Sequence, residues 1–308
     1  MQEKIVVGQG GEYPLNGMLV LPDEGTAPYP AVVFVHGSGP SDMDSKVFNV
    51  SPFKDMAEGL AKHGVASIRY DKRTFVYAKK MAKAWDGTVK EETIEDAVLA
   101  TELLRSDARI DSSRIFIAGL SMGGLLAPRI DAEGGNYAGL IIMAGTPRRL
   151  EDAMKSQQDD FLSKSNAVIR WLAKGQIKKL NKKFDNIYNL SDEEARKTPI
   201  IGKQLMAIYF KDMGQKQVRE YLEGSTKPVL VMQGDGDFHV DIEKDFNEYK
   251  DILKNNPNAK FILYPGLNHV FMPTVYGDVS KAKKEYKKPQ HVVDYVMADI
   301  AGFISNVN

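Results

Sequence analysis

The side chain best suited to chemistry is Ser121, in the segment Gly119-Leu120-Ser121-Met122-Gly123. An apolar run over residues 114–118 comes directly before this segment, and a helical pattern from Leu125 to Ile130 follows it. This order of strand, sharp turn and helix is the context of a nucleophile elbow, where small neighbours let a serine stand exposed on a strained turn. The following helix would point its N-terminal amides at a developing oxyanion. A glycine-rich turn with a serine N-cap is the alternative from this segment alone.

A second glycine-rich loop, His36-Gly37-Ser38-Gly39-Pro40, follows an earlier buried strand. Such a loop can turn a backbone N–H toward the same oxyanion, and in nucleophile-elbow enzymes the other donor is the amide that follows the serine. We therefore predict that the amides of Ser38 and Met122 form an oxyanion hole. His36 comes before the nucleophile and within this loop, so we expect it to hold the shape of the loop rather than act as a base.

The remaining histidines are the candidates for a general base. His269 ends the segment 265–269, which follows an apolar strand-like run, and active sites of α/β folds assemble at the carboxyl ends of such strands. His239 is its competitor, since it lies in the loop that also holds the candidate acids. His63 stands at a glycine-capped helix end, where a histidine suits the helix dipole, and His291 is expected on the surface. His269 is thus the predicted base.

The acid that orients the base is expected in the segment 234–241, which contains three aspartates. Asp235 precedes a glycine, a pairing typical of a tight turn, so we expect its carboxylate to bind local backbone amides. Asp241 comes just before an apolar helical pattern, which is the position of an N-cap. Asp237 lies past the turn and is the predicted partner of His269.

The elements that must position these residues are visible as short apolar runs bounded by Gly, Pro or Asp. Several are apolar throughout, as expected of strands covered on both faces. The runs are Ile5–Val7, Met18–Leu21, Ala31–Val35, Val65–Tyr70, Ile115–Ala118, Leu140–Ala144, Val229–Met232 and Phe261–Tyr264. Amphipathic helical patterns follow at 94–104, 242–253 and 292–304, and Pro52 and Pro289 stand where a helix accepts proline in its first turn. This alternation predicts a doubly wound α/β fold with a mostly parallel central sheet and helices on both faces.

The alternation is interrupted after residue 146. The chain runs to Lys227-Pro228 without a convincing strand and carries helical patterns at 150–162, 168–180 and 204–222. We predict an inserted helical cap at 147–226 between two parts of an α/β core, 1–146 and 227–308, because long insertions at this edge of a sheet usually serve the site there. Lysine pairs at 178–179 and 182–183 are typical of a solvated helix face. The candidates for an apolar pocket lining are Met154, Phe161, Trp171, Leu172, Met206, Tyr209 and Phe210.

The amino-acid composition of the 308 residues excludes several classes of function. Lysine plus arginine and aspartate plus glutamate both number 41, so the net charge of zero favours a small-molecule partner over nucleic acid or an anionic membrane. The lack of cysteine excludes disulfides, thiolate metal sites and cysteine nucleophiles. No stretch approaches the roughly 20 apolar residues of a membrane helix. No secretory h-region is visible at the N-terminus, so we expect a cytoplasmic location, and the oligomeric state is left open.

Four motifs together resemble the α/β-hydrolase superfamily, and within it small bacterial esterases and serine-aminopeptidase-like hydrolases with a helical cap. The motifs are the segments 36–40, 119–124, 233–237 and 265–269, which stand in the order of the superfamily and span almost the whole chain outside the predicted cap. The resemblance implies a triad of Ser121, His269 and Asp237, since Asp237 matches the acid position of the Gly-x-x-Asp pattern. The segment Arg69-Tyr70-Asp71-Lys72-Arg73 also resembles these enzymes, although Thr-Phe-Val-Tyr follows it here in place of the usual glycines.

The resemblance implies a serine hydrolase that works by two-step acyl transfer through an acyl-enzyme, with no metal or organic cofactor. We expect a carboxylesterase acting on small or medium acyl esters, including those of the hydroxycinnamoyl type. An acyl-CoA thioesterase or a serine aminopeptidase-like peptidase is the enzymatic alternative, and a non-catalytic binding module is the remote one. An aminopeptidase would need carboxylates for the substrate amine, for which Glu193-Glu194 and Asp159-Asp160 are the candidates.

Overall fold

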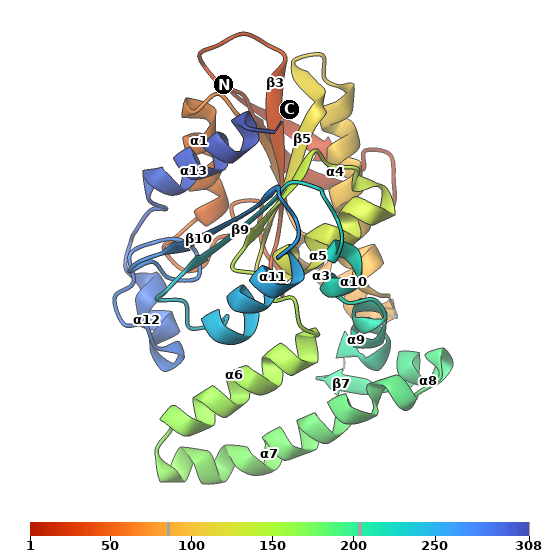
Figure 1. Cartoon of the computed structure of the whole chain (residues 1–308). Helices are drawn as coiled ribbons and strands as arrows, with labels where there is room; N and C mark the ends of the chain where they lie inside the picture. Colours follow the sequence, from red (N-terminus) through yellow and green to blue (C-terminus); the bar gives the residue numbers. More distant parts are fainter. Residues whose placement is uncertain (85–86, 203–204, 308) are drawn as a thin grey trace.

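The computed structural model describes residues 1–84, 87–202 and 205–307. Within these residues one sheet has eight strands in the order β1-β2-β4-β3-β5-β6-β9-β10 (Figure 1). The strands are β1 (Gln2–Val7), β2 (Leu15–Val20), β3 (Tyr29–Val35), β4 (Ala66–Tyr70), β5 (Ile110–Leu120), β6 (Gly139–Met143), β9 (Val229–Gly234) and β10 (Ala259–Tyr264). β2 pairs antiparallel with β1 and β4, and the neighbours from β4 to β10 pair parallel. Each predicted apolar run coincides with one of these strands.

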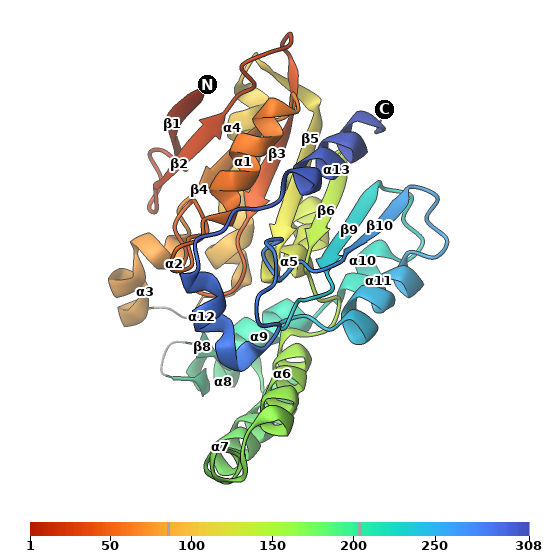
Figure 2. The same ribbon diagram turned by 90° about the vertical axis from the view of Figure 1, so that its left-hand side faces the viewer.

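Helices cover both faces of this sheet (Figure 2). These helices are α1 (Pro52–Lys62), α4 (Glu95–Ser106), α5 (Met122–Ile130), α11 (Asn247–Ile252) and α13 (Asp294–Ser305). Side chains of β3 alternate between the two faces: Phe34 packs in the layer of α1 and α13, and Val33 in the layer of α4 and α5. A sheet buried on both faces explains why its strands read as continuous apolar runs. The predicted fold class is confirmed.

Shorter elements complete the α/β core. They are α2 (Arg73–Val76), α3 (Ala78–Ala84), α12 (Ala282–Lys287), the wide π-helical turns η1 (Lys90–Ile94), η2 (Asp131–Gly135) and η4 (Ile242–Phe246), and the 3-10 turn η5 (Val279–Lys281). η1 and η4 run directly into α4 and α11, so each predicted helix there is a π turn followed by an α-helix. α2 begins at Arg73, so the residues that directly follow the segment 69–73 are helical.

Pro52 and Pro289 were both expected in the first turn of a helix, and only one of them lies there. Pro52 lies in the first turn of α1, as predicted. The prediction for Pro289 was wrong, because this residue lies in an irregular segment between α12 and α13. Asp55 of α1 holds that segment: its carboxylate accepts hydrogen bonds from the ring of His291 and from the amide of Val292, both at 3.1 Å. These contacts keep the backbone out of a helical path until α13 begins.

The region predicted as a cap, residues 147–226, is mostly helical. It contains α6 (Leu150–Lys164), α7 (Ala167–Asn186), the 3-10 turn η3 (Ile187–Asn189), α8 (Asp192–Lys197), β7 (Pro199–Ile201), β8 (Leu205–Met206), α9 (Ala207–Gly214) and α10 (Val218–Leu222). α6 and α7 form a hairpin that extends below the sheet (Figure 1). The expectation of no strand was wrong, since β7 and β8 pair antiparallel.

The prediction of one helical segment at 204–222 was also wrong. Gln204 lies outside the described residues, and the chain continues as β8, α9 and α10. The break before α10 has a local cause, because Gln217 and Glu220 form a capping box that starts a new helix. α10 buries Val218 and Leu222 in the same core cluster as α5, so it belongs to the packing of the core as much as to the cap. The domain boundaries at 147 and 226 stay a prediction.

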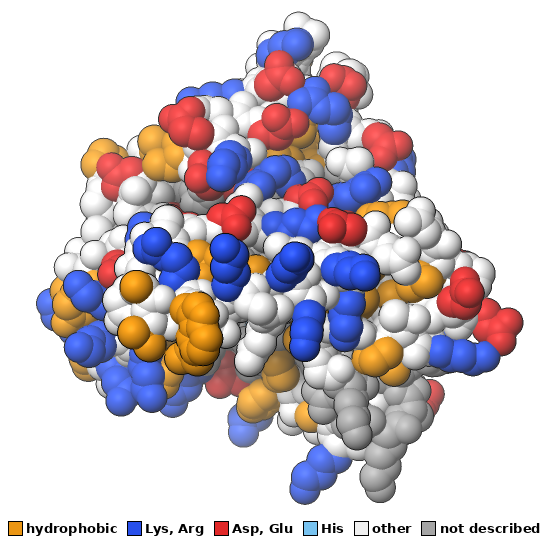
Figure 3. All heavy atoms as spheres, turned by 90° about the horizontal axis from the view of Figure 1, so that it is seen from below, with side chains coloured by type: hydrophobic (Ala, Val, Ile, Leu, Met, Phe, Trp, Pro, Cys, Tyr) orange, Lys and Arg blue, Asp and Glu red, His pale blue; other side chains and the backbone are white. Residues whose placement is uncertain are grey.

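The underside of the molecule carries many lysine and arginine side chains (Figure 3). Lys178, Lys179 and Lys182 of α7 are exposed, in keeping with a solvated helix face, whereas the ammonium of Lys183 donates to the carbonyl of Pro199 at 2.8 Å. In the described residues no helix is long and apolar enough to cross a membrane.

Candidate active site

Ser121 stands at the sharp turn between β5 and α5. Its backbone has φ 57° and ψ −117°, a strained conformation for a residue with a side chain. The amide of Ser121 donates to the carbonyl of Met143 on β6 at 2.8 Å, which holds the turn against the sheet. The backbone crosses itself closely here, because a Cβ on Gly119 would lie 2.1 Å from the carbonyl oxygen of Gly123. Only glycine fits at position 119, so the turn has the geometry predicted for a nucleophile elbow.

The loop after β3 packs directly against this turn. A Cβ on Gly37 would lie 3.3 Å from the Cβ of Ser121 and 3.8 Å from its Oγ. Ser38, Ser121 and Met122 line the same cavity. Met122 is the first residue of α5, so its amide is one of those that a helix leaves without an internal acceptor. The structure thus brings Ser38 and Met122, the residues of the two predicted oxyanion donors, to the cavity that Ser121 lines.

His269 and Asp237 form a buried pair between the loops that follow β10 and β9. Nδ1 of His269 donates to Oδ2 of Asp237 at 2.8 Å. The other carboxylate oxygen accepts from the amides of His239 at 2.7 Å and Val240 at 3.1 Å. With the proton on Nδ1, Nε2 of His269 is a free acceptor, which is the tautomer that a general base requires.

The other two aspartates of this loop have separate partners. Oδ1 of Asp235 accepts from the amide of Gly266 at 2.6 Å and so ties its turn to the loop that follows β10. Asp241 caps η4, accepting from the amide of Lys244 at 2.9 Å, as predicted for an N-cap. Of the three carboxylates, the one on Asp237 is the partner of His269.

Two further histidines lie near the candidate site. Nε2 of His36 donates to the carbonyl of Tyr70 at 2.6 Å, so His36 holds its loop to β4, as predicted. Burial lowers the pKa of His36 to about 4. The ring of His239 lies 4.8 Å from that of His269, edge to face, and lines the cavity. Burial, helped by the nearby His269, lowers the pKa of His239 to about 4 as well. Both rings are therefore neutral near pH 7.

The cavity beside Ser121 has a volume of about 380 Å³ and lies between the core and the 147–226 region. From that region α6 contributes Leu150, Ala153, Met154 and Gln157, and α9 contributes Tyr209 and Phe210. Three of the predicted lining residues, Met154, Tyr209 and Phe210, are therefore in place. Phe161 and Met206 are not part of the lining.

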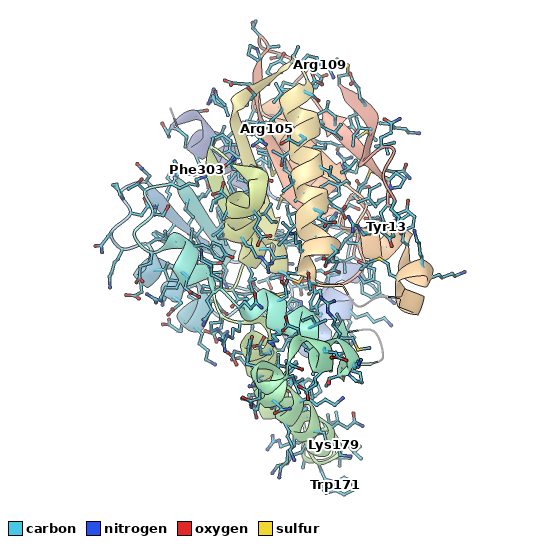
Figure 4. The ribbon with its side chains drawn as sticks, turned by 90° about the vertical axis from the view of Figure 1, so that its right-hand side faces the viewer. Tyr13, Arg105, Arg109, Trp171, Lys179 and Phe303 are labelled. Carbon is cyan, nitrogen blue, oxygen red and sulfur yellow. The ribbon has the colours of Figure 1, made fainter. Side chains whose placement is uncertain are left out.

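The prediction that Trp171 and Leu172 line the pocket was wrong. Both lie near the start of α7, at the far end of the helical hairpin (Figure 4), and are 78% and 61% exposed. The hairpin extends past the core, and the first turns of α7 are exposed there. The apolar character of the two residues gave no signal of this, because exposure there depends on the length of the hairpin.

Sequence reasoning missed the polar residues of the cavity. The lining includes Glu92 from η1, which binds Tyr209, and Asp245 from η4. Asp245 accepts from Nε of Arg148 at 2.7 Å and from the hydroxyl of Thr146 at 2.7 Å. In the sequence, Glu92 sits in a charged helical stretch typical of a solvated surface, so no local pattern marks it. Among the described residues, no group of three or more His, Asp or Glu side chains is arranged to hold a metal ion.

Comparison with known proteins identifies the family. The model of the prolyl oligopeptidase family matches residues 53–298, and the chain belongs to that family. The resemblance to the α/β-hydrolase superfamily is thereby confirmed. Esterase EstD of Thermotoga maritima is 33% identical over 287 residues, which cover 93% of this chain and 64% of the relative. The chain thus spans a little under two thirds of the length of that esterase.

Solved structures share the fold at low sequence identity. Est1E of Butyrivibrio proteoclasticus with bound ferulic acid aligns over 96% of this chain and 99% of its own, with a TM-score of 0.58 and 18% identity. The Pyrococcus furiosus esterase Pf2001 aligns over 100% of this chain and 91% of its own, with a TM-score of 0.58 and 16% identity. At these identities the likeness supports the fold alone.

Proposed function

We propose that this protein is a serine hydrolase, a carboxylesterase for small or medium acyl esters, with Ser121 as nucleophile, His269 as general base and Asp237 as the acid. The observation that carries the proposal is that Ser121, on its strained turn, lines one cavity together with Ser38 and Met122. Acyl transfer through a tetrahedral intermediate requires a nucleophile with backbone donors close to it, and these residues can supply them.

The reaction would proceed in two steps. Nε2 of His269 takes the proton of the Ser121 hydroxyl as Oγ attacks the ester carbonyl, and the amides of Ser38 and Met122 hold the oxyanion. The imidazolium then protonates the leaving alcohol, leaving an acyl-enzyme on Ser121. His269 then takes a proton from water as the water oxygen attacks the acyl carbonyl. The bond from the carbonyl to Oγ breaks, the acid leaves, and the imidazolium returns the proton to Oγ of Ser121. Asp237 keeps the proton on Nδ1 throughout, since its second oxygen is held by two backbone amides.

The cavity supports the proposed size of the acyl group. Its volume of about 380 Å³ is near the lower end of the range for small-molecule sites, about 300–1,000 Å³. Met154 and Phe210 give it apolar walls suited to an aliphatic or aromatic acyl chain. Esterase EstD is an esterase by its name, and the fold neighbour Est1E binds ferulic acid, a hydroxycinnamate. Both support the choice of esters, with hydroxycinnamoyl esters among them.

The aminopeptidase alternative gains no support from its candidate carboxylates. Glu194 completes a capping box with Ser191, and Asp160 pairs with Lys164 on the surface at 2.8 Å. Among the described residues that line the cavity, the carboxylates Glu92 and Asp245 each bind a cation of the protein, Lys72 and Arg148 respectively. A substrate amine would have to compete with those cations.

Labelling with a fluorophosphonate tests the nucleophile, and a substrate panel tests the class. Wild-type protein is expected to be labelled and the variant Ser121→Ala not. Among p-nitrophenyl acetate, butyrate, hexanoate and decanoate, a feruloyl ester, an acyl-CoA and aminoacyl anilides, we expect turnover of the shorter esters and the feruloyl ester. Turnover of the anilides alone would replace the esterase proposal with a peptidase.

A further inference from the structure

A charged network is buried at the edge of the cavity, next to the loop that holds Ser38. Nζ of Lys72, which follows β4, lies 3.1 Å from Oε1 of Glu92 on η1. The other oxygen of Glu92 accepts a hydrogen bond from the hydroxyl of Tyr209 on α9. The three residues are only 2%, 5% and 4% exposed. The core and the 147–226 region therefore share this network.

Burial of a charge pair carries a desolvation cost that its own attraction often fails to offset, so the pair by itself is weak evidence of a role in stability. The remaining contact of the ammonium is more informative. Nζ of Lys72 also donates to the carbonyl of Gly37 at 3.0 Å. Gly37 directly precedes Ser38, whose amide is a proposed oxyanion donor.

We propose that Lys72 is a positioning residue of the oxyanion hole, held in place by Glu92 and Tyr209. The argument rests on the plane of the peptide bond between Gly37 and Ser38. In a trans peptide the carbonyl and the following N–H point in opposite directions, and the plane is rigid. An ammonium that holds the Gly37 carbonyl on the buried side therefore turns the Ser38 N–H to the opposite side, toward the cavity that Ser38 lines.

The network also reaches the second donor. The hydroxyl of Tyr209 lies 3.5 Å from Sδ of Met122, whose amide begins α5. The network thus reaches both proposed donor amides, that of Ser38 through the carbonyl of Gly37 and that of Met122 through the contact of its Sδ with Tyr209. Tyr209 comes from α9 in the 147–226 region. The network therefore joins the residues next to Ser121 to the region that supplies much of the cavity lining.

This inference rests on the proposed function, and its test compares two variants that differ only at Lys72. Glu92→Gln keeps Lys72 and its bond to Gly37, and the amide oxygen of Gln can still accept from the ammonium. Because this variant leaves Lys72 as the uncompensated buried charge, its folding is checked by circular dichroism, and wild-type protein replaces it as the reference for the double variant if it does not fold. The double variant Lys72→Met/Glu92→Gln removes that bond without leaving Glu92 as an uncompensated buried charge, which is what would endanger folding in Lys72→Met alone. Lys90→Met, at an exposed lysine of η1, is the control for loss of a lysine in this part of the chain.

The expected result is a kcat for p-nitrophenyl acetate that is about 10- to 100-fold lower in the double variant than in Glu92→Gln, with little change in KM. This is less than the 10²–10³-fold loss of a deleted donor, because the Ser38 amide is turned rather than removed. The affinity for a trifluoromethyl ketone, which forms an oxyanion on the serine, should fall by a similar factor, while the affinity for the product carboxylate stays. Lys90→Met should behave as wild type.

A double variant that is folded by circular dichroism, with kcat and trifluoromethyl ketone affinity within about twofold of Glu92→Gln, would overturn the inference. An equal loss of affinity for the ketone and the carboxylate would also overturn it, since that pattern marks a damaged pocket. Failure of the proposed function gives a different result: wild-type protein would then resist fluorophosphonate and turn over no ester.

Discussion

Asp237 contacts His269 through one carboxylate oxygen and the backbone of its own loop through the other. Oδ2 accepts from Nδ1 of His269 at 2.8 Å, and Oδ1 accepts from the amides of His239 and Val240. The backbone amides fix the orientation of the carboxylate, and the carboxylate in turn fixes the tautomer of the imidazole. A proposed base held in this way has its Nε2 ready to accept a proton.

Asp237→Asn is expected to lower kcat about 10⁴-fold, because an amide at this position allows the wrong tautomer of His269. Asp235→Asn and Asp241→Asn should lose much less, since those carboxylates bind the amides of Gly266 and Lys244. Ester hydrolysis by the three variants, each checked for native folding by circular dichroism, makes the comparison. If Asp235→Asn lost most of its kcat and Asp237→Asn stayed active, Asp235 rather than Asp237 would be the acid of the triad.

Ser121→Ala should abolish turnover of activated esters through the acyl-enzyme. The remaining rate, which comes from the oxyanion site and from binding, should be about 10³–10⁴-fold above that of the reaction in water. Folding should be preserved, because the turn depends on the backbone bond from Ser121 to Met143 and on Gly119 rather than on the hydroxyl. Thermal unfolding and p-nitrophenyl acetate hydrolysis measure the two properties. Activity near that of wild type would show that another residue is the nucleophile.

Met154→Ala should change acyl preference, because the thioether lines the cavity. We expect kcat/KM for a hexanoyl ester to fall about tenfold relative to that for the acetyl ester, the scale of lost apolar contacts in a pocket. Trp171→Ala is the matched control in the same region, since its side chain is 78% exposed at the end of the hairpin. If Trp171→Ala shifts the preference and Met154→Ala does not, the cavity described here is not the acyl site.

Stability should fall in mild acid, and His36 should account for part of the loss. Its pKa is about 4 in the folded protein against an ordinary value of 6.5, so between these values the unfolded chain binds more protons. The free energy of unfolding therefore decreases as pH falls from above 6.5 toward 4, with on the order of 2 kcal/mol lost by pH 5 through this group.

Urea unfolding at pH 7, 6 and 5 checks this contribution in wild type and in His36→Gln, which can still donate to the Tyr70 carbonyl but does not titrate. The variant should lose less stability on acidification than wild type. His239 has a lowered pKa too and is present in both proteins, so the difference isolates His36. Identical slopes against pH would mean that His36 is not held neutral by burial.

The sequence by itself determined the strands and the local chemistry of the turns. The strands were readable because both faces of the sheet are covered, which makes each run apolar throughout. Asp235, Asp237 and Asp241 could be told apart because turns and N-caps depend on neighbours within a few residues. Ser121 was recognisable for the same reason, since a strained turn between strand and helix requires small residues next to it.

Only the tertiary structure decided what lies between elements that are far apart in the chain. Glu92 and Tyr209 are 117 positions apart, and they meet because the fold brings α9 and η1 to the same cavity. The loss of a helix start at Pro289 follows from the contact of its segment with Asp55, more than 200 positions away. Trp171 is exposed because the hairpin of α6 and α7 extends past the core. Each of these outcomes depends on how helices pack over the sheet, which no local pattern of residues encodes.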